Sequence, residues 1–72
     1  MRVYRFLIVI EKADANYSAY SPDLPGCIAT GHTHEDAQRN MVKAIHMHVQ
    51  GLLEDGSPVP TSQAAAEYVA IP

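Results

Sequence analysis

The segment Tyr20–Cys27, with the sequence YSPDLPGC, carries the strongest turn signals in this 72-residue chain. Pro22 and Pro25 fix their own φ angles and favour an extended conformation of the residue before each of them. Gly26 permits a positive φ, and Asp23 can hydrogen-bond the backbone two residues further on. These residues predict a stiff connection between two strands.

A preorganised loop is also a suitable binding surface, because little conformational entropy is lost when a partner docks on it. Two interpretations of the segment therefore stay open: a structural connection, or a partner-binding site at Asp23, Leu24 and Pro25. Leu24 could either tuck inward or project as an apolar contact.

Strand-like segments lie on both sides of this loop. Residues 17–21 (YSAYS) precede it, and residues 27–31 (CIATG) follow it. Residues 2–12 (RVYRFLIVIEK) are rich in β-branched and aromatic types, and the turn-prone residues 13–16 would join them to the next strand as a hairpin. Residues 67–71 (EYVAI) could form a fourth strand.

The first predicted strand is apolar on both of its faces. One face carries Tyr4, Phe6, Ile8 and Ile10, and the other carries Val3, Leu7 and Val9. A strand of this kind is covered on both sides. We expect the second set to form a core or oligomer face.

The residues after Gly31 predict one long helix over residues 33–55. Thr33 is a good N-cap with Asp36 at the N3 position, and Gly56 is a natural C′ stop. The helix has an inward stripe at one-face spacing, formed by Ala37, Met41, Ala44, Ile45, His48 and Leu52.

The element order predicts a single α+β domain over residues 1–72, with a β-β-β-α-β layout. One helix would pack on one face of a three- to four-stranded sheet. Little of the chain remains to cover the other face, so we expect a homo-oligomer or a partner protein there.

Composition limits the classes of function. A chain of this size buries only about 60% of its unfolded surface, so small domains often add disulfides, a metal or oligomerisation. The single cysteine excludes an internal disulfide and favours a reducing, cytoplasmic location. No apolar run approaches the roughly 20 residues that span a membrane. The net charge of −3 argues against direct binding of nucleic acid.

Four histidines raise the question of a metal site: His32, His34, His46 and His48. On a helix, residues i and i+2 point about 200° apart, so the second pair cannot chelate together. No third ligand stands at a recognisable spacing, and we expect neither a metal nor a cofactor. His48 lies within the inward stripe, as a core histidine or as a pH-sensitive interface contact.

No active site can be assembled from these residues. A cysteine nucleophile needs a base and an orienting group, and Cys27 has neither at a recognisable position. The acidic residues fall at strand ends, turns and helix ends, and no glycine-rich phosphate loop occurs. We expect no enzymatic activity and no catalytic residues; an enzyme that uses Cys27 or His48 is the weakest alternative.

The segment Tyr17–Ala37, YSAYSPDLPGCIATGHTHEDA, resembles the HicB family of toxin–antitoxin antitoxins. That family has a strand that leads into a PDLPGC-like segment, then a G-x-[ST] step and an acidic helix start. Its helix ends at a glycine that is followed by a Pro-x-Pro element. This chain has the matching residues in the same order: Gly31, Thr33, Glu35–Ala37, Gly56 and Pro58–Pro60. The resemblance covers about residues 3–70.

The resemblance implies a partial RNase H-like fold without nuclease activity. It also implies a partner, because HicB antitoxins bind and neutralise HicA, a small basic toxin that cleaves mRNA. Many members carry a C-terminal DNA-binding domain, and a chain that ends at Pro72 is not expected to contain one. The alternative function is an orphan oligomeric domain that binds a small ligand or another regulator.

Overall fold

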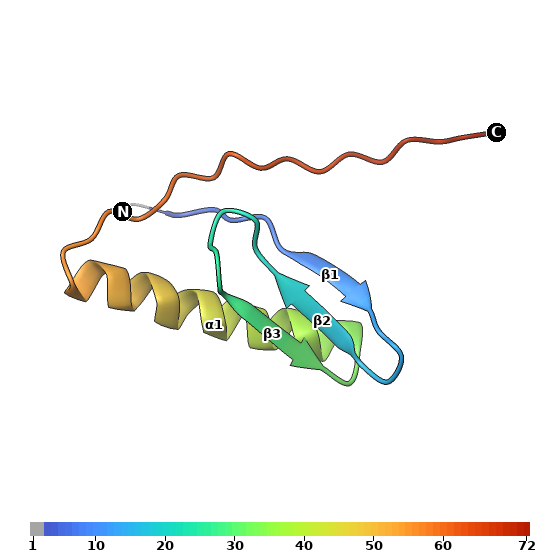
Figure 1. Ribbon diagram of the computed structural model, residues 1–72, viewed down its shortest axis with the longest axis horizontal. Helices are drawn as coiled ribbons and strands as arrows, with labels where there is room; N and C mark the ends of the chain where they lie inside the picture. Colours follow the sequence, from blue (N-terminus) through green and yellow to red (C-terminus); the bar gives the residue numbers. More distant parts are fainter. Residues whose placement is uncertain (1–2) are drawn as a thin grey trace.

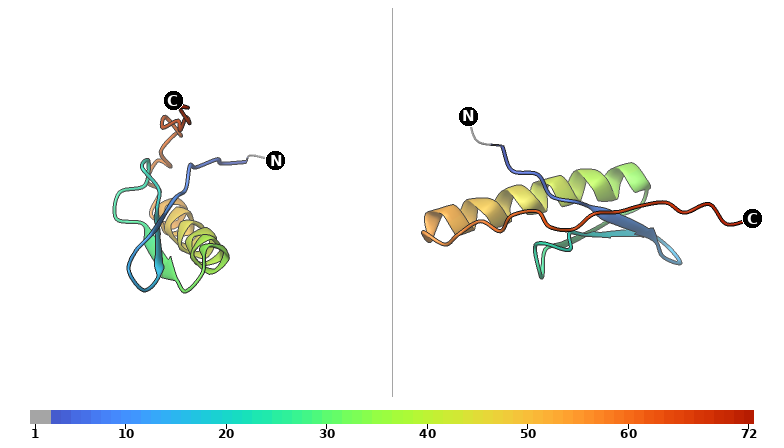
Figure 2. Two further views of the ribbon diagram at one scale, coloured as in Figure 1. Left: turned by 90° about the vertical axis from the view of Figure 1, so that its right-hand side faces the viewer. Right: turned by 90° about the horizontal axis from the view of Figure 1, so that it is seen from above.

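The computed structural model describes residues 3–72 and contains a three-stranded sheet with one helix (Figure 1). The strands are β1 (Val9–Lys12), β2 (Tyr17–Tyr20) and β3 (Ile28–Gly31), and the helix is α1 (His34–Glu54). The sheet is antiparallel in the order β1-β2-β3. Figure 2 shows that α1 lies across one face of it. The predicted α+β domain with three consecutive strands and one helix is confirmed.

The register of the sheet separates a covered face from an open one. Ile10, Ala19 and Ala29 stand opposite one another across the three strands. Ala19 is buried and the other two pack against the core, so this row faces α1. Successive residues of a strand point to opposite faces. The neighbouring row of Val9, Tyr20 and Ile28 therefore lies on the outer face.

The core is small, as expected for a short chain. Its fully buried residues come from β2, from the loop that follows and from the first half of α1: Ala19, Leu24, Cys27, Ala37 and Met41. Phe6, Ile8 and Ile10 pack against these residues, so this face of the first strand meets the core.

Both ends of α1 are capped as the sequence predicts. The Thr33 side-chain oxygen accepts a hydrogen bond from the Asp36 backbone N–H at 3.0 Å. At the other end, Gly56 has a φ of 70°, and the Ser57 N–H donates to the Leu52 carbonyl at 2.9 Å. The Gly56 N–H donates to the Leu53 carbonyl at 3.2 Å. These two bonds together form a Schellman motif.

The connection from β3 to α1 depends on a close backbone approach at Gly31. A Cβ atom at this position would lie 2.7 Å from the Asp36 carbonyl carbon, which real Cβ atoms do not tolerate. The Asn40 side chain fastens the same junction, because its amide donates to the Thr30 carbonyl at 2.8 Å. The first turn of α1 is thereby held against the end of β3.

The first strand is shorter than the predicted 2–12. Only Val9–Lys12 is paired, residues 3–8 continue it in an extended form, and residue 2 lies outside the described residues. The cause is its neighbour: β2 ends at Tyr20, and Pro22 follows in the loop. No strand of residues 3–72 runs beside residues 3–8.

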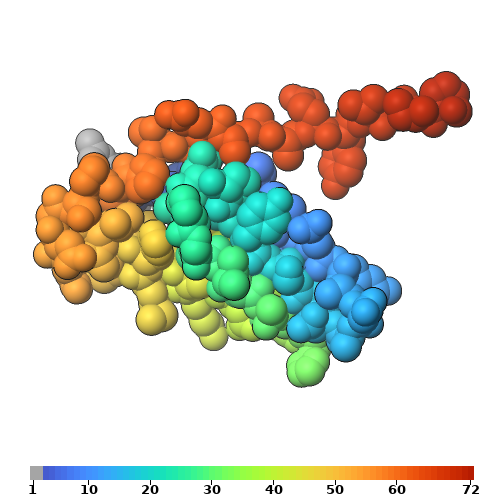
Figure 3. All heavy atoms as spheres, viewed as in Figure 1, coloured from blue at the N-terminus to red at the C-terminus, as the bar shows by residue number. Residues whose placement is uncertain are grey.

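The possible fourth strand at residues 67–71 is not formed. Residues 57–72 run extended along the molecule, and their last part stands away from its body (Figures 1 and 3). Val69 and Ile71 are 76% and 80% exposed. Strand-favouring residue types alone make no sheet without a neighbouring strand to pair with. Within residues 3–72, no helix is long and apolar enough to cross a membrane.

Candidate partner-binding surface

The Tyr20–Cys27 loop consists of two consecutive tight turns. The Leu24 N–H donates to the Ser21 carbonyl at 3.1 Å, and the Cys27 N–H donates to the Leu24 carbonyl at 3.1 Å. The second turn has proline at its second position and Gly26, with a φ of 82°, at its third. This is the pattern of a type II turn. The predicted stiff connection is therefore present, with each proline in the position that favours a turn.

Leu24 joins the two turns and points inward. It is only 1% exposed and belongs to the core. The hypothesis that Leu24 contacts a partner is wrong for this conformation, because its side chain fills the space between sheet and helix. Pro25, the next residue in the chain, is exposed. Of the two alternatives for Leu24, the structure selects the inward one.

Asp23 contacts a segment about 40 residues away. Its Oδ2 atom accepts hydrogen bonds from the Gln63 and Ala64 backbone N–H groups, each at 3.2 Å. The Ser62 hydroxyl donates to the same oxygen at 3.4 Å. The sequence predicted a local turn role or a partner contact for Asp23, and the partner contact stays a prediction. No periodic or motif signal marks residues 62–64 as the counterpart, so this contact could be found only from the fold.

An exposed apolar surface lies where the loop meets the helix. Gly26, Cys27 and Ile28 line one side of a hollow of about 360 Å³, and α1 lines the other side. Ile28 and Met47 are 71% and 76% exposed at its border. Tyr20 continues this surface across the outer face of the sheet, since it is the register partner of Ile28. We call Tyr20, Ile28 and Met47 the outer patch.

His48 lies at the edge of the outer patch and not within the core. It is half-buried and lines the same hollow as Met47. The predicted inward stripe is therefore narrower at its C-terminal half than the spacing suggests. Ala37 and Met41 are fully buried, whereas His48 is reached from the surface.

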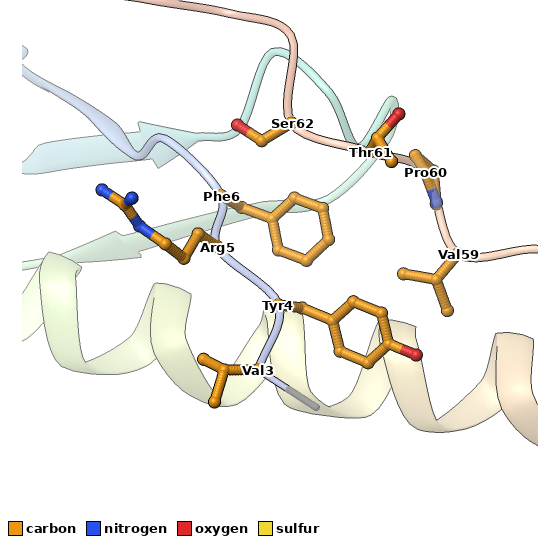
Figure 4. Close-up of a pocket in the computed structure, with 8 residues that line it drawn as sticks. All are labelled: Val3, Tyr4, Arg5, Phe6, Val59, Pro60, Thr61 and Ser62. Atoms are coloured by element: carbon orange, nitrogen blue, oxygen red, sulfur yellow. The ribbon is translucent and has the colours of Figure 1, made fainter. Parts of the chain in front are cut away.

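The second face of the first strand also opens to the surface. Val3 is 70% exposed, while Leu7 and Val9 are half-buried. Val3 lines a hollow of about 390 Å³, whose far side is formed by residues 59–62. In Figure 4 the rings of Tyr4 and Phe6 point across this space toward Val59. The expectation that Val3, Leu7 and Val9 meet a further protein surface stays a prediction.

Burial and packing set the surroundings of two titratable side chains, Cys27 and His34. Burial raises the pKa of the Cys27 thiol, which favours the protonated form over the nucleophilic thiolate. Within residues 3–72, no three histidine, cysteine or acidic side chains are grouped as metal ligands. His34 instead packs edge-to-face on Tyr17, with the ring centroids 6.3 Å apart. The arrangement can support protein contacts through the outer patch and the open strand edge.

The chain matches a known protein family. The model of the "HicB_like antitoxin of bacterial toxin-antitoxin system" family matches residues 6–72. The chain belongs to the HicB-like antitoxin family. The resemblance of the PDLPGC segment and its flanking elements to HicB is thereby confirmed.

Two relatives show how far the similarity extends. A UPF0150 protein of Synechocystis is 31% identical over 71 residues, which cover 97% of this chain and 90% of that protein. An uncharacterized 14.9 kDa protein of Haemophilus phage HP1 is 39% identical over 62 residues. These residues are 86% of this chain but 47% of the phage protein, so this chain spans about half of that relative's length.

Two solved structures share the fold. The N-terminal domain of the Burkholderia pseudomallei antitoxin HicB has a TM-score of 0.69 and 37% identity, and the match covers 82% of this chain and 70% of that domain. A chain from the "HicA3 and HicB3 toxin-antitoxin complex" has a TM-score of 0.65 and 29% identity, with 82% and 72% of the two chains covered.

Proposed function

We propose that this protein is an antitoxin that binds and neutralises a small HicA-type toxin that cleaves mRNA. The observation that carries the proposal is the family membership over residues 6–72. The likeness to a chain from a solved HicA3–HicB3 complex also supports a toxin partner. Neutralisation by binding requires a complementary surface and no catalytic group.

The outer patch is the surface we assign to the toxin. Tyr20, Ile28 and Met47 are large apolar or aromatic side chains that this chain leaves exposed. Aromatic residues and methionine are enriched at the centres of protein interfaces. Pro25 borders the patch on a turn that is already ordered, so little entropy is lost there on docking. Half-buried His48 completes its rim.

The charge of the chain suits a basic partner. The sequence has 8 acidic residues against 5 lysines and arginines. An excess of negative charge attracts a cationic ribonuclease and accelerates encounter, mainly at low ionic strength. The same excess opposes direct contact of this chain with nucleic acid. We accordingly propose a cytoplasmic protein whose contact with RNA runs only through its toxin.

Co-expression tests the proposal in cells. A HicA-type toxin from the same genome is expressed with and without this protein, and growth is followed. We expect the antitoxin to restore growth and to co-purify with the toxin at a fixed ratio. Toxicity that persists at full antitoxin expression, together with no co-purification, would contradict the proposal.

A variant pair locates the contact on the outer patch. Ile28→Asp places a charge at an exposed apolar position, and we expect it to weaken rescue. Gln38→Asp on the helix is the control, because Gln38 is exposed and lies outside the patch. Equal rescue by both variants, at equal expression, would show that the outer patch does not bind the toxin. Toxin binding itself would still be tested by the wild-type protein.

A further inference from the structure

Strand β1 has an open edge that continues beyond its own pairing. The order β1-β2-β3 leaves β1 with one neighbour. Residues 3–8 extend it, and among residues 3–72 no backbone hydrogen bond outside the helix and strands involves them. An edge with unpaired N–H and C=O groups is a template for another strand.

The same chain holds an unpaired strand-like segment. Residues 65–71, which we call the tail, contain the EYVAI sequence and are exposed throughout. Tyr68, Val69 and Ile71 are types that favour strands, and their exposure leaves apolar area in water. At roughly 3.3 Å per residue, seven extended residues reach about 23 Å. The tail is therefore long enough to pair along a strand edge.

In its own chain the tail runs past the β1 edge without meeting it. Three hollows of about 390, 490 and 380 Å³ separate residues 3–10 from residues 59–68. The lining residues of both segments advance together, so the two segments run parallel, as Figure 1 also shows. Among residues 3–72, no backbone hydrogen bond joins these two segments, so the N–H and C=O groups of the edge stay unpaired.

Asp23 anchors the start of the C-terminal segment. Its carboxylate holds residues 62–64 against the loop of residues 21–27, which we call the proline loop, through the three hydrogen bonds described above. Pairing Glu67 with Arg5 in the same chain would shift residues 62–64 back along the edge and away from Asp23, because these residues now face residues 5–7. The run of alanines at 64–66 follows immediately and can serve as a hinge. Short hinges of this kind favour exchange of an element between copies.

We propose that the tail of one copy pairs as a parallel strand with residues 3–9 of a second copy, and that the exchange is reciprocal. A two-fold axis then relates the two copies, so that each open edge pairs with the tail of the other copy through the same contact. The contact uses the β1 edge of the sheet, and none of the three outer-patch residues takes part in it. It is therefore independent of toxin binding.

Charge and side-chain pattern select the register. Glu67 is the only acid of the tail, and Arg5 is the only basic residue in 3–8. Parallel pairing of Glu67 with Arg5 sets Tyr68 beside Phe6 and Val69 beside Leu7. It also sets Ala70 beside Ile8 and Ile71 beside Val9, so that every remaining neighbour is apolar. The antiparallel alternative centred on the same charges leaves Ile71 beyond the end of residues 3–8.

Disulfide trapping between two differently substituted chains tests the exchange without any toxin. Leu7→Cys and Val69→Cys are made separately in a Cys27→Ala background, mixed and oxidised. We expect a covalent dimer of the two chains. Lys43→Cys, on the exposed helix surface, replaces Leu7→Cys as the control and should trap at least about tenfold less.

The same pair in one chain separates the alternatives. A covalent dimer of the double variant supports exchange. A monomer with an internal disulfide would overturn it in favour of closure within one chain. If no disulfide forms and light scattering shows a monomer, the exchange is also overturned. The open edge would then be a site for a different protein.

A charge reversal tests the register independently. Arg5→Glu and Glu67→Arg should each weaken the dimer several-fold, and the double variant should recover most of the affinity by light scattering or analytical ultracentrifugation. Val69→Asp should weaken it about tenfold or more. A dimer of unchanged affinity in Val69→Asp, with the circular dichroism of the native chain, would contradict the proposal.

Discussion

Two segments lie outside the helix and strands: the proline loop at residues 21–27 and the tail at residues 65–71. They differ in whether their backbone N–H and C=O groups are hydrogen-bonded within the chain. The loop closes two turns by its own hydrogen bonds and sends Leu24 and Cys27 into the core. The tail has neither a ladder nor a buried side chain. The comparison shows that an irregular segment can be the best-packed part of a small domain, while a strand-prone segment can be its least packed.

The largest expected effect is the loss of the loop's buried side chain. Leu24→Ala removes a nearly fully buried leucine from a small core, and we expect a loss of about 2–4 kcal/mol in the free energy of unfolding. Urea denaturation followed by circular dichroism measures it. Leu53→Ala is the matched control, because Leu53 is half exposed on α1, and it should cost less than about 1 kcal/mol. Equal losses in the two variants would contradict the central packing role of the loop.

A pair of glycines tests the turn geometry. Gly26→Ala places a side chain at a φ of 82°, so we expect a loss of about 1–2 kcal/mol in unfolding free energy. Gly51→Ala is the opposite case, because Gly51 lies within α1 and has open space at its Cβ position. Here we expect a gain of up to about 1 kcal/mol. Unchanged or increased stability in Gly26→Ala would show that the type II turn does not constrain the loop.

The contact that joins the two regions comes next. Asp23→Ala removes the acceptor for residues 62–64, and a charged acceptor contributes about 1.5–3 kcal/mol at most, less at an exposed site. We expect faster proteolysis and faster amide exchange at Gln63 and Ala64, with a small change in global stability. Pro22→Ala keeps the carboxylate and serves as the control for the loop. Unchanged exchange at Gln63 in Asp23→Ala would show that the anchor is not formed.

The smallest effect is expected at Ser21, the first residue of the double turn. Its hydroxyl is buried, and no group of residues 3–72 is hydrogen-bonded to it. Ser21→Ala removes an unsatisfied polar atom without changing the turn, so stability should rise by up to about 1 kcal/mol. Thermal unfolding of the two proteins measures the difference. A clear loss of stability would show that the hydroxyl has a partner and that the loop is satisfied differently.

Local chemistry explains how much could be predicted from the sequence. Prolines and Gly26 specify their turns within four residues, and Thr33 and Gly56 specify the helix ends in the same way. These features were predictable because cause and effect are adjacent in the chain. The PDLPGC segment also carried the family resemblance.

Features that depend on distant neighbours were not predictable in the same way. Within residues 3–72, the first strand pairs only at Val9–Lys12 because β2 turns away. The tail forms no ladder with the first strand, although Ala66 and Tyr68 line a hollow together with residues 7–10. Residues 62–64 have no local sign that they meet Asp23. The inward position of Leu24 follows from the space between sheet and helix, which no sequence pattern describes.

Suppression of RNA cleavage in vitro tests the central claim most directly. A purified HicA-type toxin from the same genome is incubated with mRNA and with increasing amounts of this protein. Cleavage should fall to the background level at a fixed molar ratio, and the Ile28→Asp variant should require more protein than the Gln38→Asp control. Cleavage that continues unchanged at a large excess of folded antitoxin would contradict the assigned function.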